Sequence, residues 1–318
     1  MKKRAVFLDA YTLNPGDNNL DELNQYIDLE IYGHSEGDQI LERSRGKEIL
    51  IVNKVVVSGA LMKQLPELKF IQVAATGYNN IDLDAARDLG VVVSNISGYS
   101  TSSVAQHVFA MLLSYLNSTE RYNAEVRAGA WSKCRDFSYW HQPILELSGK
   151  TIGLLGYGSI AQAVSRIALA FGMRVLCSTR TIPNDVNDVV FVEPSEMVAN
   201  SDFVSLHAPL TEATFEFINA DMLSKMKKEA VLINTARGQL IDEQALFRAL
   251  KYGDIAAALL DVMVNEPPAI DNVLLSLDNC YITPHQAWAS LEARQRLVEL
   301  MIESLEAYIK GEPINQVN

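Results

Sequence analysis

The stretch Thr151-Ile-Gly-Leu-Leu-Gly156-Tyr-Gly158-Ser-Ile-Ala161 decides the fold of this chain. A short apolar run passes directly into a Gly-x-Gly-x-x-Ala turn, which opens a segment with helical patterning. In this setting the first glycine permits a tight turn, and the second lets the backbone approach a pyrophosphate at the helix N-terminus. Ala161 takes the position of a third glycine, where alanine is accepted. The stretch predicts a dinucleotide-binding unit, with a merely tight structural turn as the alternative, and its expected cofactor-binding residues are Gly156, Tyr157, Gly158, Ser159 and Ile160.

Short apolar runs alternate with helical stretches around this unit, as in a parallel sheet wrapped by helices. We predict a helix over 159–171, ended by Gly172, within a doubly wound domain from about Ser100 to about Ala287. Its predicted strands are 151–155, 174–177, 189–192, 203–206, 231–234, 256–262 and 280–283. The preceding part alternates more weakly, with predicted strands 5–8, 49–53, 55–57, 70–74 and 91–94 and predicted helices 19–26, 60–64 and 83–89. An amphipathic tail over 291–309 is expected to pack back on that first part.

A long helix is predicted to start at Ser103-Val-Ala-Gln106, a capping box in which Ser103 and Gln106 satisfy each other's backbone donors. The apolar residues that follow fall on one face at helical spacing, and the helix is expected to run towards Gly129. Its pattern fits a connector or dimer face and fits an internal core helix equally well.

The bulk composition excludes several classes of protein. The chain has 318 residues, enough for about two domains, and its formal net charge of −12 argues against a nucleic-acid binder. The basic trio Lys2-Lys3-Arg4 precedes an apolar run too short for a signal peptide or a membrane span. Three cysteines without paired spacing predict thiols in a reducing cytoplasm, with no disulfide framework and no metal site: Cys134, Cys177 and Cys280.

The choice of dinucleotide is expected at the end of the strand that follows the glycine turn. A carboxylate about twenty residues beyond the glycines binds the ribose 2′-hydroxyl of NAD, but here the sequence is Ser178-Thr179-Arg180. Without the acid, repulsion of a 2′-phosphate disappears, and a guanidinium can hold that phosphate. We therefore predict NAD(P)H binding with NADPH favoured over NADH. The alternative is that Arg180 is a solvated surface charge and that NADH is used.

Three ionisable residues follow three successive predicted strands: Arg237, Glu266 and His285. Open parallel sheets place their ligands at the carboxyl ends of the strands, so these residues are candidates for one site. Each alone has a structural interpretation, as a surface ion pair, a loop carboxylate or a loop histidine. Beside a dinucleotide-binding turn, the set favours catalysis.

With these motifs, the sequence resembles the D-2-hydroxyacid dehydrogenase family over nearly its whole length, and within it the glycerate dehydrogenase/hydroxypyruvate reductase branch. Trp288 and the early Leu-Asn-Pro-Gly segment point to that branch. Besides the glycine turn, the stretches that carry the resemblance are Tyr11-Thr-Leu-Asn-Pro-Gly16, Ala75-Thr-Gly-Tyr-Asn-Asn-Ile-Asp82, Ser103-Val-Ala-Gln106, His207-Ala-Pro-Leu-Thr211, Thr235-Ala-Arg-Gly238, Asn265-Glu-Pro267 and Thr283-Pro-His-Gln-Ala-Trp-Ala-Ser290.

The resemblance implies that His285 is the acid/base, Glu266 its orienting partner and Arg237 the clamp for the substrate. Histidine suits this role because it exchanges a proton near neutral pH, and a carboxylate on its other nitrogen fixes the tautomer. A planar guanidinium can hold the substrate carboxylate and polarise its carbonyl by a two-point contact. The implied reaction converts a small 2-oxo acid, such as hydroxypyruvate or glyoxylate, into the D-2-hydroxy acid.

The resemblance also implies further binding residues. The Thr76-Gly77 turn is expected to bind the substrate carboxylate through backbone amides. Trp140 aligns with a tryptophan that reaches the neighbouring subunit's substrate pocket, with a core aromatic as the alternative. His207 is either a cofactor-site residue or a loop histidine that shapes the cleft. Gln106 and Thr179 depart from the family pattern, where acids are usual. The remaining expected cofactor contacts are Ser103, Thr179, Arg180, His207, Ala208, Pro209, Thr235, Ala236 and Asp261.

The family's organisation predicts an α/β fold of two doubly wound parallel-sheet domains, Rossmann-like and flavodoxin-like, with a cleft between them. Residues 1–99 with 288–318 would form the substrate domain, and residues 100–287 the NAD(P)-binding domain. We expect a cytoplasmic homodimer joined through the 103–129 helix, with no nucleic-acid or membrane partner. Two alternatives stay open: a family member acting on formate, phosphite or a bulkier 2-hydroxy acid, and an NAD(P)H-sensing corepressor-like binding protein.

Overall fold

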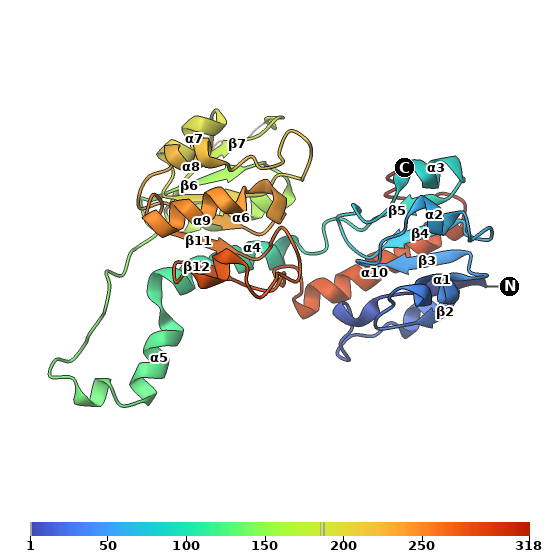
Figure 1. Ribbon diagram of the computed structural model, residues 1–318, viewed down its shortest axis with the longest axis horizontal. Helices are drawn as coiled ribbons and strands as arrows, with labels where there is room; N and C mark the ends of the chain where they lie inside the picture. The colour runs from blue at the N-terminus through green and yellow to red at the C-terminus, as the bar shows by residue number, and fades with distance from the viewer. Residues whose placement is uncertain (1, 185, 187) are drawn as a thin grey trace. The chain divides into compact units, whose positions relative to one another are not determined.

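The computed structural model describes residues 2–184, 186 and 188–318, which form two compact units. The first unit consists of Met1–Ser100 with Trp288–Asn318, and the second of Thr101–Ala287. Each unit contains one parallel sheet, five-stranded in the first and seven-stranded in the second (Figure 1). The prediction of two parallel-sheet α/β domains is confirmed.

The seven-stranded sheet has the order β12-β11-β10-β9-β6-β7-β8. All its strand pairs are parallel, and β6 lies between β7 and β9, so the strand order reverses there. Ligands bind at such a reversal in open α/β sheets, beyond the carboxyl ends of the strands. The strands are β6 Thr151–Leu155, β7 Arg174–Ser178, β8 Val189–Phe191, β9 Phe203–Leu206, β10 Val231–Asn234, β11 Ala257–Leu260 and β12 Cys280–Ile282.

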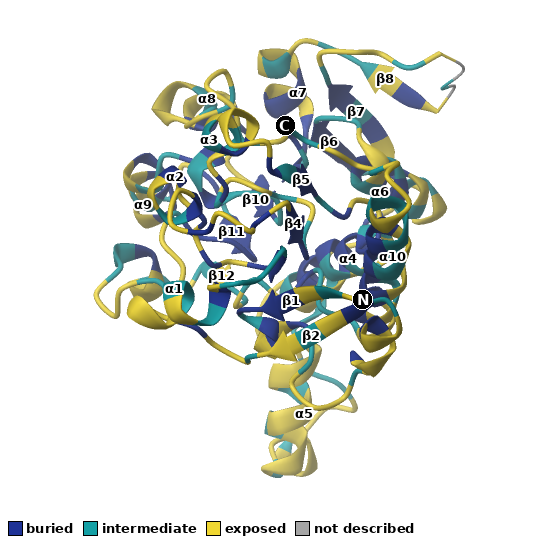
Figure 2. Ribbon diagram, turned by 90° about the vertical axis from the view of Figure 1, so that its right-hand side faces the viewer, coloured by how far each residue is buried: buried dark blue, intermediate teal, exposed yellow. Residues whose placement is uncertain are grey.

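Helices cover both faces of this sheet, because alternate strand residues point to opposite sides. Leu154 packs in a core with α4 (Thr101–Asn117) and α6 (Ser159–Ala170). Leu155 belongs to the opposite core. That core is closed by α7 (Pro194–Asn200), α8 (Ala220–Lys225) and α9 (Glu243–Tyr252), with the 3-10 turns η4 (Gly238–Leu240) and η5 (Val273–Ser276) beside them. Figure 2 shows the strands as buried between exposed helical surfaces.

The five-stranded sheet has the order β2-β1-β3-β4-β5, a doubly wound arrangement of the flavodoxin type. The long helix α10 (Leu291–Ile309) packs on one face through Leu297, Met301 and Leu305, against a core that includes Phe7 and Phe70. The other elements of this unit are β1 Lys3–Phe7, β2 Ile27–Ile31, β3 Ile49–Val52, β4 Phe70–Val73, β5 Val92–Ser94, α1 Asp38–Ser44, α2 Gly59–Met62, α3 Leu83–Asp88, η1 Ala10–Thr12 and η2 Asp21–Gln25.

In this first unit one predicted strand is wrong and one observed strand was not predicted, each for an identifiable reason. The strand predicted at 55–57 is wrong, because the Asp9 carboxylate accepts the backbone N–H groups of Asn53, Lys54 and Val55 at 2.8, 2.6 and 2.8 Å. These bonds turn the chain out of the sheet directly after β3. The edge strand β2 was not predicted, because only its first residue is buried and charged residues interrupt its apolar pattern.

The long helix predicted from Ser103 to Gly129 is also corrected. Helix α4 begins at Thr101, so Ser103 lies inside it and is not its N-cap. The helix ends at Asn117, since Ser118 adopts a left-handed φ of 46°, and α5 (Thr119–Arg127) follows. No residue of α5 is buried, and the 3-10 turn η3 (Trp131–Lys133) after it is exposed as well (Figure 2). No helix among the described residues combines the length and apolar character needed to cross a bilayer.

Candidate active site

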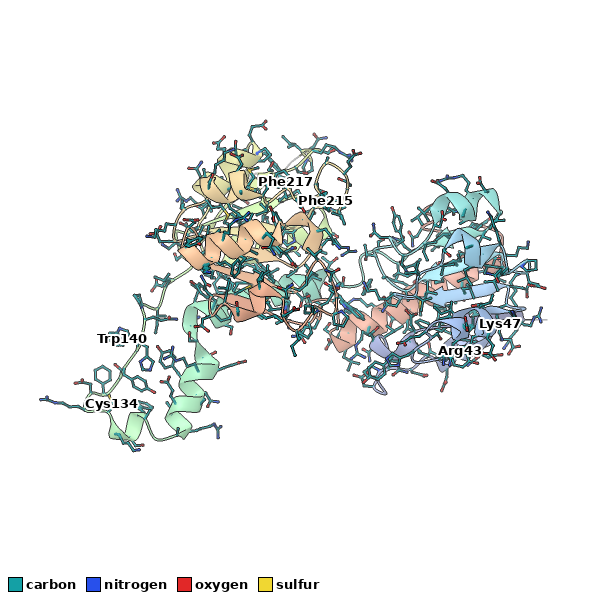
Figure 3. The ribbon with its side chains drawn as sticks, viewed as in Figure 1. Arg43, Lys47, Cys134, Trp140, Phe215 and Phe217 are labelled. Carbon is teal, nitrogen blue, oxygen red and sulfur yellow. The ribbon has the colours of Figure 1, made fainter. Side chains whose placement is uncertain are left out.

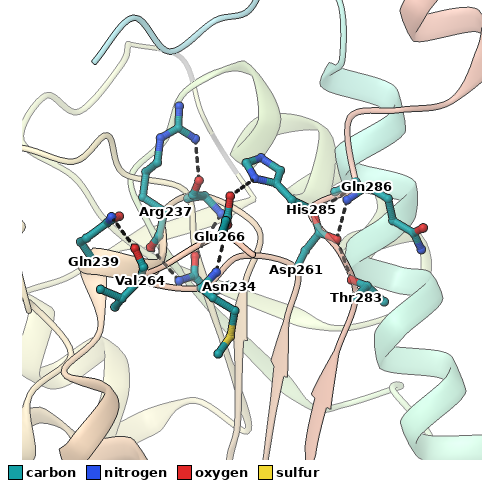
Figure 4. Close-up of polar contacts among 12 residues, drawn as sticks. Asn234, Arg237, Gln239, Asp261, Val264, Glu266, Thr283, His285 and Gln286 are labelled. Atoms are coloured by element: carbon teal, nitrogen blue, oxygen red, sulfur yellow. Dashed lines mark hydrogen bonds and ion pairs between the residues drawn. The ribbon is translucent and has the colours of Figure 1, made fainter. Parts of the chain in front are cut away.

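Three neighbouring strands position the three predicted catalytic side chains. Arg237 follows β10, Glu266 follows β11 and His285 follows β12, and these strands are adjacent in the sheet. Because the strands are parallel, their carboxyl ends lie side by side, and the loops that follow them meet. Figure 4 shows the Glu266 carboxylate between the Arg237 and His285 side chains. Residues separated by up to 48 positions (285 − 237) are thus brought into one constellation.

Glu266 fixes the ring of His285. The distance between Nδ1 of His285 and Oε2 of Glu266 is 2.6 Å, and the other carboxylate oxygen accepts the Met263 N–H at 3.0 Å. The side chains of His285 and Glu266 are 25% and 34% exposed, so the pair is accessible without being fully solvated. With Nδ1 donating to the carboxylate, Nε2 is directed outward, and no hydrogen bond to it is found among the described residues. The ring is oriented to exchange a proton through Nε2.

Asp261 holds the loop that carries His285. The backbone at His285 is left-handed, with a φ of 50°, and its N–H donates to the Asp261 carbonyl at 2.8 Å. The Asp261 carboxylate, 1% exposed, accepts the Thr283 hydroxyl at 2.6 Å and the N–H groups of Gln286 and Ala287, both at 2.9 Å. Burial alone would raise the pKa of Asp261, but hydrogen bonds from His107, Thr283 and the backbone lower it below its usual value. Asp261 is therefore an ionised anchor for this loop.

The Arg237 loop is fixed against the Glu266 loop. The fully buried Asn234 donates to the Arg237 carbonyl at 2.8 Å and accepts the Ala236 N–H at 3.0 Å. Arg237 donates through Nη1 to the Ala236 carbonyl at 2.6 Å. At Gly238 the backbone passes so close that a Cβ would lie 2.0 Å from the Met263 carbonyl carbon. Only glycine fits there, and this contact sets the separation between the arginine and the glutamate.

The glycine turn fits a dinucleotide. Gly156 has a φ of 88°, and a Cβ there would lie 3.0 Å from the backbone of Ala208, so the turn packs closely on the neighbouring loop. Gly158 is different, because a Cβ would meet nothing within 4 Å among the described residues. Gly158 is the N-cap of α6, and no side chain among the described residues caps this helix start. The amides of a helix start facing open space suit a pyrophosphate.

Other residues of this region are consistent with a bound cofactor. The hydroxyl of Thr235 is buried without a hydrogen-bond partner among the described residues. Buried polar groups are normally hydrogen-bonded, so this hydroxyl is suited to bind a cofactor atom. Ser159 lies in the first turn of α6, and Ile160 packs on the core between α4 and α6. The rings of Tyr157 and Phe191 meet edge to face, with 5.3 Å between their centroids. Thr179 and Arg180 directly follow β7, whose last residue pairs with the last residue of β6 before the glycine turn. They therefore lie at the edge where the adenosine ribose of a dinucleotide binds.

The loop after β9 carries His207, Ala208 and Pro209. His207 is half-buried, and its Nε2 forms a 2.9 Å hydrogen bond with the Ser205 hydroxyl. Desolvation lowers the pKa of His207 to about 4. The ring is therefore neutral at physiological pH. Ala208 is buried and packs on Gly156, whereas Pro209 is exposed and its carbonyl accepts the Thr214 hydroxyl at 2.7 Å. Among the described residues, no cluster of three or more His, Cys, Asp or Glu side chains is suited to a metal ion.

Four other predicted binding residues have contacts or exposure that the structure defines. Ser103 donates from α4 to the Ala287 carbonyl at 2.6 Å, a contact with the end of the His285 loop. In the five-stranded unit, the Thr76 hydroxyl donates to the Ile96 carbonyl at 3.0 Å, and the turn continues into the half-buried Gly77. Trp140 follows α5 and is 63% exposed, so the alternative that it is a core aromatic is wrong (Figure 3).

Sequence reasoning missed two residues of this region, Asn234 and His107. Asn234 stands at the end of an apolar strand, and a polar residue there was a signal that its amide ties the loop that follows. His107 offered no signal, because its partners, Thr283 and Asp261, are more than 150 residues away in the chain.

The strand reversal, the glycine turn and the Arg–Glu–His constellation define a dehydrogenase that binds a nicotinamide dinucleotide. Residues 109–287 match the family model described as "D-isomer specific 2-hydroxyacid dehydrogenase, NAD binding domain". The chain belongs to this family of oxidoreductases, which act on the CH–OH group of 2-hydroxy acids.

Individual relatives match over the whole chain. A hydroxypyruvate reductase of Blautia hydrogenotrophica is 38% identical, over 99% of both chains. A glycerate dehydrogenase of Methylorubrum extorquens is 40% identical, over 100% of this chain and 99% of the relative. A crystal structure of an NADPH-dependent glyoxylate/hydroxypyruvate reductase from Sinorhizobium meliloti, with NADP and malonate, superposes with a TM-score of 0.86 at 29% identity, covering 100% of this chain and 97% of that one.

Proposed function

We propose that this chain reduces hydroxypyruvate or glyoxylate to the corresponding D-2-hydroxy acid, glycerate or glycolate. The observation that carries the proposal is the 2.6 Å contact between His285 and Glu266 beside Arg237, at the carboxyl edge of a dinucleotide-binding sheet. The names of the two curated relatives support the choice of substrate.

Each residue of the triad has one task in the proposed reaction. When bound, NAD(P)H would supply the hydride for C2 of the 2-oxo acid. Arg237 holds the substrate carboxylate and polarises the carbonyl, so that negative charge developing on the oxygen is stabilised. His285 gives the proton from Nε2 to that oxygen, which completes the hydroxyl group. Glu266 accepts a hydrogen bond from the Nδ1–H group, keeps the ring in the productive orientation and stabilises its positive charge before transfer. The backbone amides of the Thr76-Gly77 turn would bind the substrate carboxylate.

The reaction is tested by steady-state kinetics with hydroxypyruvate, glyoxylate, bulkier 2-oxo acids, formate and phosphite. We expect the highest kcat/KM with hydroxypyruvate or glyoxylate, and the His285→Ala variant should be inactive. His34→Ala is the matched control, because His34 is an exposed histidine in the other unit, with its ring tilted against that of Tyr11, and its loss should leave turnover unchanged. Turnover of formate, phosphite or only bulky acids would replace the substrate assignment. Binding of NAD(P)H without turnover of any substrate would favour the corepressor-like alternative.

We further propose that NADPH is preferred over NADH. Thr179 and Arg180 support this, because the stretch 178–180 contains no carboxylate that would repel a 2′-phosphate and the Arg180 side chain is exposed. The paired variants Arg180→Ala and Thr179→Asp test the proposal. The first should lower kcat/KM for NADPH by about tenfold and leave NADH unaffected, since one charge-assisted bond is lost. The second should shift the preference towards NADH. A wild-type preference for NADH would refute the proposal.

We also propose a cytoplasmic homodimer. The segment from α5 to residue 146 supports the dimer, because it exposes large apolar side chains, with Phe137 90% and Trp140 63% exposed. The cytoplasmic location is supported by three cysteines that form no disulfide among the described residues. Sedimentation velocity of the wild type and of a Phe137→Ser variant tests the dimer; a monomeric wild type at micromolar concentration would refute it.

A further inference from the structure

One face of α4 contacts the loop that carries His285. Ser103, His107 and Met111 are spaced four residues apart, so they lie in one row on this helix. Ser103 donates to the Ala287 carbonyl at 2.6 Å. Nε2 of His107 lies 3.0 Å from the Thr283 hydroxyl oxygen, and the Met111 sulfur lies 3.9 Å from the same oxygen. The row therefore supports the loop at both of its ends.

The direction of the hydrogen bonds assigns the tautomer of His107. The Thr283 hydroxyl has a single proton, and its contact with the Asp261 carboxylate is the shorter one, at 2.6 Å. Since the carboxylate is ionised, that proton belongs to this bond. Nε2 of His107 must then be the donor to Thr283, and it lies 3.4 Å from the same Asp261 oxygen. The chain of donors runs from His107 through Thr283 to Asp261.

A polar ring at this place has a cost that the contact must offset. The His107 side chain is only 16% exposed, and its helix neighbours Val108 and Met111 belong to an apolar core. Burying an imidazole without a hydrogen bond is unfavourable, so an apolar residue would serve the core better. Asp261, in turn, holds the backbone of His285 in a left-handed conformation that other residues must maintain.

We propose that His107 is a positioning residue for the acid/base His285, acting through Thr283 and Asp261. The inference deepens the proposed function and rests on it for the catalytic role of His285. His107 does not touch the substrate. It fixes the Thr283 hydroxyl and the Asp261 carboxylate, and through them the backbone amides of Gln286 and Ala287 directly after His285. Loss of this donor should let the loop fluctuate and displace the His285 ring from the Glu266 carboxylate.

The experiment compares His107→Phe, which keeps the ring volume and removes the donor, with His107→Gln, whose Nε2 can replace it. We expect His107→Phe to lower kcat about tenfold while the Kd of NADPH stays within about twofold, because proton delivery is affected and cofactor binding is not. His107→Gln should recover most of the activity. Val108→Ala is the matched control, since it weakens the core under the same helix and should lower the Tm without lowering kcat.

A second readout does not depend on turnover. Amide hydrogen exchange of the peptide covering residues 283–287 should be faster in His107→Phe than in the wild type, because the Gln286 and Ala287 amides are held by Asp261. The Thr283→Val variant breaks the same chain at its other end. Adding it to His107→Phe should lower kcat no further, as expected for two residues that act as a unit.

The outcomes separate this inference from the proposed function. Wild-type exchange and wild-type kcat in His107→Phe would each overturn the positioning role. A fall in kcat that Val108→Ala reproduces, or additive effects of the two substitutions, would also overturn it. If the wild type turns over no 2-oxo acid, the proposed function fails, while the exchange of the 283–287 amides still decides whether His107 holds the loop.

Discussion

Replacing Gly238 with alanine would place a methyl group inside the backbone of the loop that carries Glu266. The Cβ would lie 2.0 Å from the Met263 carbonyl carbon, 2.2 Å from its oxygen and 2.4 Å from the Val264 nitrogen. An ordinary contact begins at 3.4 Å, so the two loops must separate by 1.4 Å (3.4 − 2.0). All three obstructing atoms are backbone, and no side-chain rotation can relieve the clash. The Arg237 and Glu266 loops must therefore move apart.

The displacement sets the expected magnitudes. Overpacking of this kind lowers the free energy of unfolding by about 1–3 kcal/mol. A shift of about 1 Å between catalytic groups lowers kcat by about a hundredfold, because the clamp and the acid no longer meet the substrate together. We expect Gly238→Ala to show both effects, with KM for the cofactor nearly unchanged. The assays are urea unfolding and steady-state kinetics with hydroxypyruvate.

Two other glycines provide matched controls. At Gly153, a Cβ would lie 2.3 Å from the Ser201 hydroxyl and 2.8 Å from Met197, so Gly153→Ala should lose similar stability away from the triad and keep kcat. At Gly33 the nearest atom would be the Tyr11 Cβ at 3.7 Å, and Gly33→Ala should resemble the wild type in both assays. Wild-type kcat in Gly238→Ala, or an equal fall of kcat in Gly153→Ala, would refute the reasoning.

Three further substitutions probe neighbouring features. Arg237→Lys should lower kcat/KM by about 10- to 100-fold in steady-state assays, because an ammonium cannot make the two-point contact of a guanidinium; an unchanged value would contradict the clamp. Asn234→Ala removes two buried hydrogen bonds and should lower the free energy of unfolding by about 2–3 kcal/mol, measured in urea; a loss below about 0.5 kcal/mol would show that the amide does not hold the loop. Desolvation lowers the pKa of His207 to about 4, below its ordinary value of 6.5, so the stability it contributes is full above pH 6.5 and is lost as the pH falls towards 4. The wild type should therefore lose more unfolding free energy than His207→Gln between pH 6.5 and pH 4, by at most about 3 kcal/mol. Urea unfolding across this pH range measures the difference, and identical pH profiles of wild type and variant would refute the assignment.

Much of the fold could be predicted because its signals are local. The strands next to the site are buried on both faces and therefore appear as continuous apolar runs, as in 203–206 and 231–234, where prediction and structure agree. The amphipathic pattern of 291–309 predicted α10 with its observed bounds. The edge strand Ile27–Ile31 was missed, because an edge strand needs little apolar surface and its charges break the pattern.

The failed predictions for the bounds of helix α4 have a different origin. The Ser103 capping box looked complete in sequence, yet the helix starts at Thr101 and the Ser103 hydroxyl bonds to Ala287, 184 residues away. The break at Ser118 likewise follows no glycine or proline signal, since a serine adopts the left-handed conformation there. In both places a contact or conformation set by the tertiary structure overrides a local preference.

The sequence by itself determined the residue types of the chemistry and the strands that present them: a glycine turn after one strand, and Arg237, Glu266 and His285 after three others. Periodicity and turn chemistry act within a few residues, so they are legible without a structure. Only the tertiary structure decided that the Glu266 carboxylate lies 2.6 Å from Nδ1 of His285, and that the Arg237 loop packs at Gly238 against the backbone of the Glu266 loop. It also decided that His107 supports the loop from α4. Such contacts depend on strand order and packing between distant segments, which no local pattern encodes.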